Sequence, residues 1–440
     1  MSQTGNATKK STVRHTRSNR VDRGKKPPTP PPDAMTAERL RQLIHPATLS
    51  QVQHYHALGL RDRLLTLPIM VALVVSLIWR QLASVSEALR VLEEEGMLWS
   101  APLKVAQQSL SQRLRVLPAE LFERILQEVL PLVAARWQAR TRPLPPEVAW
   151  ALEHYSALLA VDGSTLDVLL RQVGLLRDRP DAPLAGRMTA LLDVASRLPR
   201  QVWYSNDAQT HDQGWWPHVL QHVPAGALLL LDLGYTNYHY YAELITQQVT
   251  FITRAKSNAS YQVSQVLFKS DRVHDYLILL GGAQLPLRLI ELHYEGKWYR
   301  YLTSELDSLR LPPAYVVALY WQRWRIEEAY KTVKRLLGLA YFWVGAENGV
   351  RLQLWATWLL YAVLVDLTDE VADTLGVPFA DLSLEMIYRS LYFCTMAAHR
   401  GESDDPVAYL ADHAKSFGLI KRKRKLSPLH LLNLTVRGDP

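Results

Sequence analysis

The sequence predicts an α/β protein in which a helical N-terminal region precedes a core built on a sheet. Two short runs, 158–161 and 227–231, are apolar throughout, as is typical of strands buried on both faces of a sheet. Between 35 and 140, by contrast, apolar residues recur every three or four positions, which indicates amphipathic helices. At 440 residues the chain is long enough for about two to four structural units.

The composition is that of a folded globular protein. Hydrophobic residues make up 48% of the chain and charged residues 21%, which excludes a disordered or fibrous protein. Cys394 is the single cysteine, so an internal disulfide and a zinc site with several cysteines are excluded, and a reducing cytoplasm fits. We expect Cys394 to be a buried apolar side chain.

No segment of the chain is predicted to direct it to a membrane. The first residues are basic but lack the apolar core of a secretory signal. The most membrane-like stretch, Leu67–Trp79, has 13 residues, whereas a spanning helix needs about 20. We therefore expect Leu67–Trp79 to be a buried core helix of a soluble protein.

Positive charge is concentrated near the two ends of the chain. Residues 1–26 hold eight Lys or Arg against a single Asp, and residues 421–425 are five consecutive Lys or Arg. Such basic arms neutralise phosphates and release counterions, which favours binding to nucleic acid. Basic segments also bind acidic proteins and membrane surfaces, or serve only as solubilising tails, and charge alone leaves these alternatives open.

The N-terminal third is predicted to contain an arm and a helical domain. Residues 1–33 combine basic residues with a proline run, which predicts a disordered arm and a stiff linker. We expect a helical DNA-binding domain over 34–145. Within it, residues 107–115 carry the small polar and basic side chains of a helix that could enter a DNA major groove. An ordinary solvated helix has the same composition.

A catalytic domain is expected over 146–375, with a strand-rich insertion over about 241–304. After this insertion a proline pair opens a long helix that continues through Leu337 and stops at Gly338. The remaining residues, 376–440, are predicted to form helices followed by the basic tail.

Two aspartates follow directly on the two buried strands. Asp162 comes after the run 158–161 and Asp232 after the run 227–231, and a turn with glycine follows each. A carboxylate at the end of a buried strand is costly without a cation or a hydrogen-bonding partner. Hard divalent cations such as Mg²⁺ take oxygen ligands from one or two carboxylates and from substrate phosphates. The pair therefore predicts a metal site, for which a third carboxylate is needed.

The long helix supplies that carboxylate. At about 100° per residue, one stripe roughly 60° wide carries four polar residues. They are Tyr320, Arg323, Glu327 and Lys334. An adjacent apolar stripe would dock the helix on the sheet and so aim the polar stripe at the aspartates. Glu328 points well away from the stripe, and Glu327 is the better candidate ligand.

At these positions the sequence resembles the bacterial insertion-sequence transposases of the Asp-Asp-Glu type, in the branch marked by Tyr-x2-Arg-x3-Glu-x6-Lys. The four helix residues match that signature in full. Residues 162–164 are similar to the family's first-aspartate motif and residues 232–235 to its second, although Leu233 stands where relatives often carry a polar or small residue. The resemblance covers residues 150–370, including the 251–256 strand, and excludes the arms.

The resemblance implies a ribonuclease-H-like core in which Asp162, Asp232 and Glu327 hold two divalent ions, Mg²⁺ with Mn²⁺ as a substitute. It also implies cut-and-paste transposition, in which the enzyme nicks the element's end, forms and reopens a DNA hairpin, and joins the 3′-ends to target DNA. The partners are then double-stranded DNA, as terminal inverted repeats and target, and a second subunit in a synaptic dimer. Such a bacterial protein is expected in the cytoplasm, associated with the nucleoid.

Further residues are assigned to DNA contacts. Arg323 and Lys334 are fixed cations suited to phosphate oxygens near the cut, and Tyr320 would add a phosphate hydrogen bond. Trp298, in the strand-rich insertion, is predicted to stack a base flipped out of the hairpin, with a core aromatic as the alternative. The tryptophans that flank the polar stripe are interpreted as packing residues, Trp321 and Trp324.

Two other functions remain open from the sequence. A nuclease with the same triad would hydrolyse DNA without joining strands, and an assay for strand transfer separates the two. A DNA-binding protein that has lost catalysis, such as a repressor of transposition, would be unaffected by alanine at the triad. The intact triad argues against this second alternative.

Overall fold

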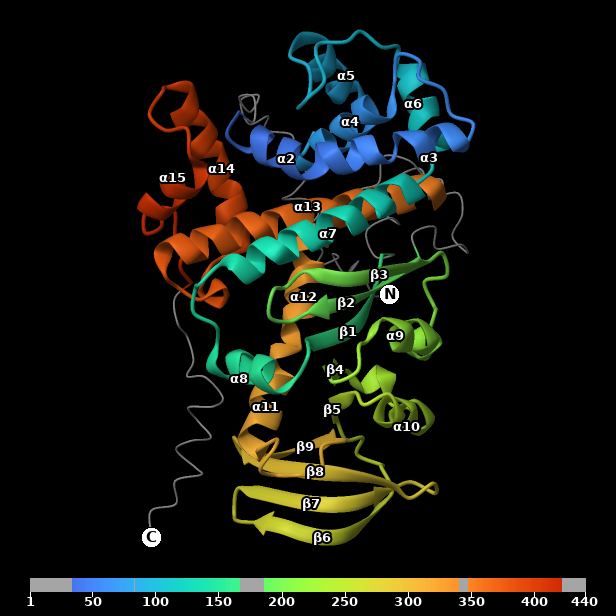
Figure 1. Cartoon of the computed structure of the whole chain (residues 1–440), viewed down its shortest axis with the longest axis vertical. Coiled ribbons are helices and arrows are strands. Elements are labelled where there is room, and N and C mark those ends of the chain that lie inside the picture. The colour runs from blue at the N-terminus through green and yellow to red at the C-terminus, as the bar shows by residue number, and fades with distance from the viewer. Residues whose placement is uncertain (1–33, 83, 167–185, 340–346, 422–440) are drawn as a thin grey trace, which may run out of the picture.

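The computed structural model describes residues 34–82, 84–166, 186–339 and 347–421 (Figure 1). The predicted basic arm and all but the first residue of the basic tail lie outside these ranges. In Figure 1 a group of helices at the top rests on two long helices, below which an extended sheet runs to the bottom of the molecule.

Nine strands of the described residues form one mixed sheet in the order β3-β2-β1-β4-β5-β9-β8-β7-β6. Their bounds are β1 Leu158–Thr165, β2 Arg187–Asp193, β3 Pro199–Ser205, β4 Leu228–Leu231, β5 Thr250–Arg254, β6 Tyr261–Lys269, β7 Val273–Leu280, β8 Leu285–Tyr294 and β9 Lys297–Thr303. The strands β1–β3 form an antiparallel meander, β4 and β5 run parallel to β1, and β6–β9 are antiparallel to their neighbours. This sheet with its helices confirms the predicted α/β class.

Helices cover both faces of the central strands. One face packs against α8 (Pro146–His154) and α11 (Pro313–Gln322), and we call it the α11 face. The other packs against α9 (Trp216–His222) and α10 (Tyr238–Thr246), and we call it the α10 face. Because successive side chains of a strand point to opposite faces, each residue near the site can be assigned to one of them.

The strands β6–β9 continue the core sheet, because β9 pairs with β5. The stretch expected as an insertion, 241–304, therefore forms no separate sheet, and it also includes β5 and the end of α10. Arg288 of β8 is fully buried, and its Nε and Nη2 each donate to Asp275 of β7 at 2.7 Å. Its Nη1 donates to the carbonyl of Leu311 at 2.6 Å, which ties these outer strands to the segment before α11.

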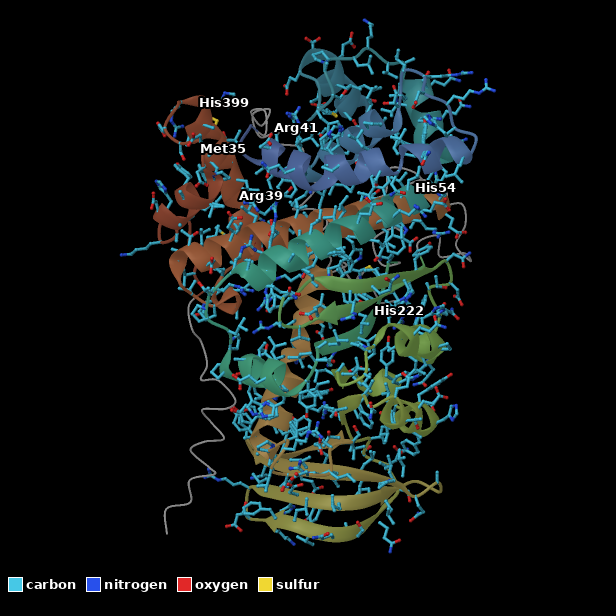
Figure 2. All side chains as sticks on the ribbon, viewed as in Figure 1. Met35, Arg39, Arg41, His54, His222 and His399 are labelled. Carbon is cyan, nitrogen blue, oxygen red and sulfur yellow. The ribbon has the colours of Figure 1, made fainter. Side chains whose placement is uncertain are left out.

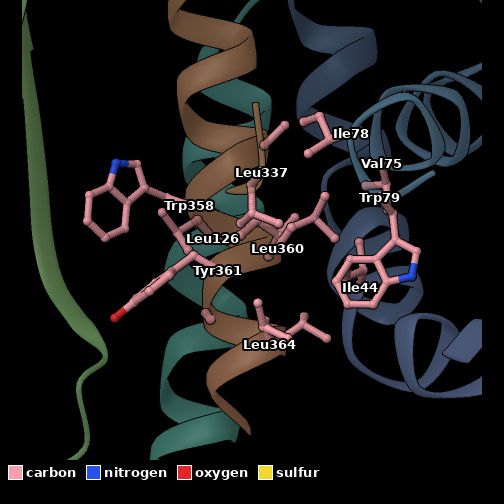
Figure 3. Close-up of a cluster of buried hydrophobic side chains, with 14 of the residues drawn as sticks. Ile44, Val75, Ile78, Trp79, Leu126, Leu337, Trp358, Leu360, Tyr361 and Leu364 are labelled. Carbon is pink, nitrogen blue, oxygen red and sulfur yellow. The ribbon is translucent and has the colours of Figure 1, made fainter. Parts of the chain in front are cut away.

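The helical region forms a second core. Its first helices are α2 Ala34–Ser50, α3 Val52–Ala57, α4 Leu67–Trp79, α5 Val85–Glu94, α6 Gln107–Val116 and α7 Glu120–Ala139. Later in the chain come α13 Glu347–Leu375, α14 Leu384–His399 and α15 Pro406–Asp412. Figure 3 shows Leu360 of α13, Leu126 of α7 and Trp79 of α4 in one cluster of buried hydrophobic side chains. The predicted core helix α4 is thus buried, as is Cys394, whose thiol pKa is raised to about 12 by burial.

Among the described residues, one helix is long and apolar enough to cross a membrane, and it is α13. This helix is longer than Leu67–Trp79, the stretch expected from the sequence to be the most membrane-like. Of the most apolar 18-residue window of α13, 94% is buried inside the molecule, as in a core helix.

The acidic residues of α13 are paired with arginines from the helical region. Asp366 accepts from Arg140 at 2.8 Å and from Arg39 of α2 at 2.6 Å, and Figure 2 labels Arg39 beside α13. Asp369 accepts from Arg142 Nε at 2.5 Å. Because buried charges are tolerated when they are paired, these contacts allow α13 to carry carboxylates through the core and join it to the N-terminal helices.

The long helix predicted up to Leu337 is interrupted. It consists of α11, a break at Arg323, α12 (Trp324–Lys331) and a π-helical turn, η5 (Thr332–Leu336). Gly338 ends it with φ 77°, a conformation that favours glycine. A uniform rotation of about 100° per residue therefore fails near Lys334, since a π-helical turn holds more residues than an α-helical one.

Candidate active site

The two aspartates lie side by side where the parallel pairing of β1 and β4 ends. Val161 of β1 pairs with Leu231 of β4, and in both cases the next residue along the chain is an aspartate. Asp162 lies inside β1 and not at its end, because β1 continues to Thr165 in pairing with β2. Asp232 begins the 3₁₀ turn η4 (Leu233–Tyr235). The expectation that both aspartates end their strands is therefore correct only for Asp232.

Arg323 brings the three predicted carboxylates together. Its Nη1 lies 3.3 Å from Oδ2 of Asp162, and its Nη2 lies 3.5 Å from Oδ1 of Asp232 and 3.0 Å from Oε1 of Glu327. The Arg323 side chain is only 8% exposed, and each carboxylate is more exposed than this. One cation therefore faces three anions in a cluster that opens to solvent on the carboxylate side.

The two neighbouring glutamates of α12 have different environments. Glu327 points at Arg323, whereas Glu328 accepts from Arg197 and from Arg325, each at 3.1 Å. Glu328 is thus neutralised by two arginines away from the aspartates. The structure places Glu327 at the site, as the rotation of the helix indicates.

Tyr330 connects α12 to the strand of Asp162. Its hydroxyl donates to the main-chain carbonyl of Asp162 at 2.5 Å and accepts from the backbone N–H of Ala190 at 2.9 Å. Asp162 and Ala190 are paired in β1 and β2, so the hydroxyl is inserted between two facing backbone groups of the sheet. By its spacing Tyr330 falls on the apolar stripe of the helix, and nothing in the sequence predicted this contact.

The remaining residues of the polar stripe have unequal access to the site. Lys334, on the π-helical turn, donates from Nζ to Oγ of Ser164 at 2.7 Å and so lies beside β1, two residues beyond Asp162. Tyr320 is buried against Tyr301 and Arg323, and burial raises its pKa to about 12. Lys334 is therefore near the surface of the site and Tyr320 lies beneath it.

Burial is the main influence on the charge of Asp162. Burial, with smaller contributions from the neighbouring Asp232 and Asp212, raises the pKa of Asp162 to about 6. Arg323 and the backbone N–H of Gly163 oppose this rise. A nearby cation would stabilise the charged form of Asp162, as expected for a carboxylate that ligates metal.

The donor set has the chemistry of a divalent-cation site. Three carboxylates converge on one positive group, and hard cations such as Mg²⁺ prefer carboxylate oxygens. In the part of the chain that the structure describes, no group of three or more His, Cys, Asp or Glu side chains is placed to hold a metal ion. The three carboxylates therefore fit such an ion by chemical type, whereas their placement in the structure is set by their shared partner, Arg323.

Trp298 is not brought to the triad. It lies on β9 opposite His293, is 44% exposed, and stacks on His274 at 4.4 Å. The alternation of β9 puts it on the α10 face with Leu302, whereas Asp162 follows Ala160 on the α11 face. Trp298 therefore reaches solvent on the side of the sheet opposite Arg323 and Glu327.

Three other side chains near Arg323 differ from expectation or were missed. Trp321 is 40% exposed and Trp324 60% exposed, so the interpretation of both as packing residues is wrong. The Trp324 ring lies 5.7 Å from the Arg323 guanidinium carbon. Arg254, at the end of β5, is exposed and lies over the Tyr299 ring at 6.0 Å. Its strand was noted in the sequence, but only the sheet order shows that it ends beside β4.

Comparison with known proteins finds similarity between part of this chain and transposases. Residues 184–363 match the family described as "Transposase DDE domain", a segment that contains Asp232 and Glu327 and begins after Asp162. A protein of Sinorhizobium fredii named "Putative transposase y4zB" is 28% identical over 152 residues. That similarity covers 32% of this chain and 43% of the relative, so this chain spans less than half of the protein it matches.

Proposed function

We propose that this protein is a DNA transposase that cleaves and joins DNA strands by phosphoryl transfer at Asp162, Asp232 and Glu327. The observation that carries the proposal is the convergence of these carboxylates, from two strands and a helix far apart in the sequence, on Arg323. The match of residues 184–363 to a transposase domain supports the same function.

The core is proposed to be ribonuclease-H-like. The supporting observation is the order of its first five strands, β3-β2-β1-β4-β5, with an antiparallel meander followed by two strands parallel to β1. In this arrangement Asp162 and Asp232 come together where the pairing of β1 with β4 ends, and α12 adds Glu327 from the α11 face.

Asp162, Asp232 and Glu327 would hold the divalent ions, with Mg²⁺ proposed and Mn²⁺ as a substitute. Two ions bound there would supply activation of a water or 3′-hydroxyl nucleophile and stabilisation of the leaving oxygen of an in-line displacement at phosphorus. The carboxylates themselves hold and orient the cations. Lys334, near the surface of the site, would contact the phosphates beside the cut, and Arg323, behind the carboxylates, would add fixed positive charge close to them.

Tyr330 keeps Asp162 and Glu327 in register. Its hydroxyl bonds to the backbone of Asp162, while its own helix carries Glu327 three residues earlier. A rigid connection of this kind matters because displacement of a catalytic group by about 1 Å can reduce a rate by about a hundredfold. Tyr320, buried under Arg323, is proposed to support the arginine in addition to any contact with phosphate.

The full reaction is proposed to be cut-and-paste transposition in the branch with the Tyr-x2-Arg-x3-Glu-x6-Lys signature. It would include end nicking, formation and opening of a hairpin, and strand transfer, carried out by a dimer on terminal inverted repeats in the bacterial cytoplasm. The complete signature at Tyr320, Arg323, Glu327 and Lys334 supports this branch.

The test is to incubate purified protein with the DNA of its own element's ends and a target plasmid, with Mg²⁺ or chelator. Products are followed on denaturing gels for wild type, Glu327→Gln and Glu328→Gln. Glu328 is the matched control, because it is the adjacent glutamate and points to Arg197 and Arg325 instead of the aspartates. We expect Mg²⁺-dependent nicks, hairpins and joined strands from wild type and from Glu328→Gln, and none from Glu327→Gln.

The alternative functions predict different DNA products on these gels. Cleaved ends that are never joined to target DNA would identify a nuclease. Binding of DNA without cleavage by any divalent ion would identify a protein that only binds DNA. Thermal unfolding of each variant shows whether loss of the Glu328 ion pairs has merely destabilised the fold.

A further inference from the structure

A second charged pair lies behind the aspartates, on the α10 face of the sheet. Arg187, the first residue of β2, forms an ion pair with Asp212, the first residue of the 3₁₀ turn η3 (Asp212–Trp215). Both side chains are largely buried. Arg187 pairs with Thr165 of β1, and the alternation of β1 puts Thr165 and Gly163 on the face opposite Asp162. The pair therefore lies across the sheet from Arg323.

This pair occupies the space that a side chain at either motif glycine would need. A Cβ built on Gly163 would lie 2.6 Å from Nη2 of Arg187 and 2.7 Å from Oδ1 of Asp212. A Cβ built on Gly234 would lie 2.5 Å from Oδ2 of Asp212. Neither glycine has a positive φ, so space and not backbone conformation requires glycine at both positions. Asp212 thus packs one oxygen against the residue after Asp162 and the other against the turn after Asp232.

The turn that carries Asp212 is itself bound to the loop after β4. Nε2 of Gln213 donates to the carbonyl of Gly234 at 2.5 Å, and Nδ2 of Asn237 donates to Oε1 of Gln213 at 3.0 Å. Arg187 provides the matching connection to β1 and β2 through its ion pair with Asp212. Asp212 is therefore the point at which the strand of Asp162 and the loop of Asp232 are held to each other.

We propose that Asp212, held by Arg187, is a positioning residue that sets the separation of the Asp162 and Asp232 carboxylates and so the affinity of the site for divalent cations. This inference rests on the proposed function. Residues that hold metal ligands in place change metal affinity by about 10- to 100-fold when they are replaced. Asp212 faces the side of the sheet away from Glu327, so it acts through the glycines and not as a ligand of the same ions.

The experiment measures Mn²⁺ binding to the purified full chain without DNA, by electron paramagnetic resonance. The variants are Asp212→Asn, which removes the charge, and Asp212→Glu, which keeps it but is one methylene too long for the space beside the glycines. Asp207→Asn, an exposed aspartate in the preceding turn, is the matched control. We expect both Asp212 variants to bind Mn²⁺ about tenfold more weakly or worse, and the control to bind as wild type does.

DNA cleavage as a function of Mn²⁺ concentration gives the second readout. The Asp212 variants are expected to regain cleavage at high Mn²⁺, because their ligands remain, whereas Asp162→Asn is not. If the Asp212 variants fail to fold, Gly163→Ala tests the same contact from the other side with every charge retained, and it too is expected to weaken Mn²⁺ binding.

Several results would overturn the inference. If Asp212→Glu binds Mn²⁺ like wild type and only Asp212→Asn is weakened, Asp212 contributes charge and not position. If both variants bind Mn²⁺ normally, or if wild type binds no Mn²⁺, the positioning role is wrong. The proposed function is judged separately, because it fails when wild type cuts no DNA whatever the Asp212 variants bind.

Discussion

Two buried arginines, Arg288 of the sheet and Arg323 of the long helix, meet carboxylates in different ways. Arg288, in the outer strands, is fully buried with a single carboxylate, Asp275, and a carbonyl completes its hydrogen bonding. Arg323 faces three carboxylates that reach solvent. The first cluster is neutral and closed, and the second carries two negative charges beyond its own cation. A closed pair holds strands together, whereas an open acidic cluster can accept further cations and the phosphates that accompany them.

The largest effect is expected when a carboxylate is removed from the open cluster. Asp232→Asn should reduce Mg²⁺-dependent DNA cleavage by at least about a thousandfold, as loss of a catalytic group commonly does. In metal-free buffer its free energy of unfolding should stay constant or rise, because like charges around Arg323 are relieved. Cleavage assays and urea denaturation measure the two effects, with the exposed Asp271→Asn as control. A strong loss of stability would show that Asp232 is a structural partner like Asp275.

Removing the carboxylate from the closed pair should instead lower the stability of the protein. Asp275→Asn leaves the buried charge of Arg288 uncompensated, and we expect the free energy of unfolding to fall by about 3–5 kcal/mol. Replacing both partners, as Asp275→Leu with Arg288→Met, should recover most of this loss, since the buried charges are then absent. Urea denaturation measures both variants. A single variant as stable as wild type would contradict the contrast between the clusters.

Removing one atom, the hydroxyl oxygen of Tyr330, would break the connection between α12 and β1 at the open cluster. Tyr330→Phe leaves the Asp162 carbonyl and the Ala190 N–H without their shared hydroxyl, which should cost about 1–3 kcal/mol of stability. Cleavage should fall more than this loss of stability explains, because Asp162 and Glu327 lose their common support. Tyr392→Phe, an exposed tyrosine of α14, should be neutral in both assays. Equal behaviour of the two variants would exclude a special role for Tyr330.

The smallest expected effect concerns the base-stacking aromatic. Stacking of a base on an aromatic side chain is worth about 1–3 kcal/mol. Trp324 is exposed beside Arg323, whereas Trp298 is exposed on the opposite face of the sheet. We expect Trp324→Ala to slow hairpin formation on 2-aminopurine-labelled ends more than Trp298→Ala does. The reverse order would support the prediction made for Trp298 from the sequence.

The candidate triad could be identified from local patterns because each pattern lies within one element. Apolar runs followed by Asp162 and Asp232 indicate buried strands, and the rotation of one helix separates Glu327 from Glu328. Such local patterns did not predict contacts in which the two side chains belong to different elements. Trp324 was predicted to be a packing residue because it is a large aromatic, and only the structure shows that its side chain is exposed.

The sequence by itself determined the α/β class and pointed to three candidate carboxylates, since apolar runs and the rotation of a helix are properties of one element. The tertiary structure alone decided that Arg323 faces all three, that Tyr330 enters the pairing of β1 with β2, and that Asp212 lies under two glycines. Most of these contacts join residues far apart in the sequence, up to 168 positions for Tyr330 and Asp162. They depend on how elements pack, and nothing in the local pattern of a single element specifies its partner across the sheet.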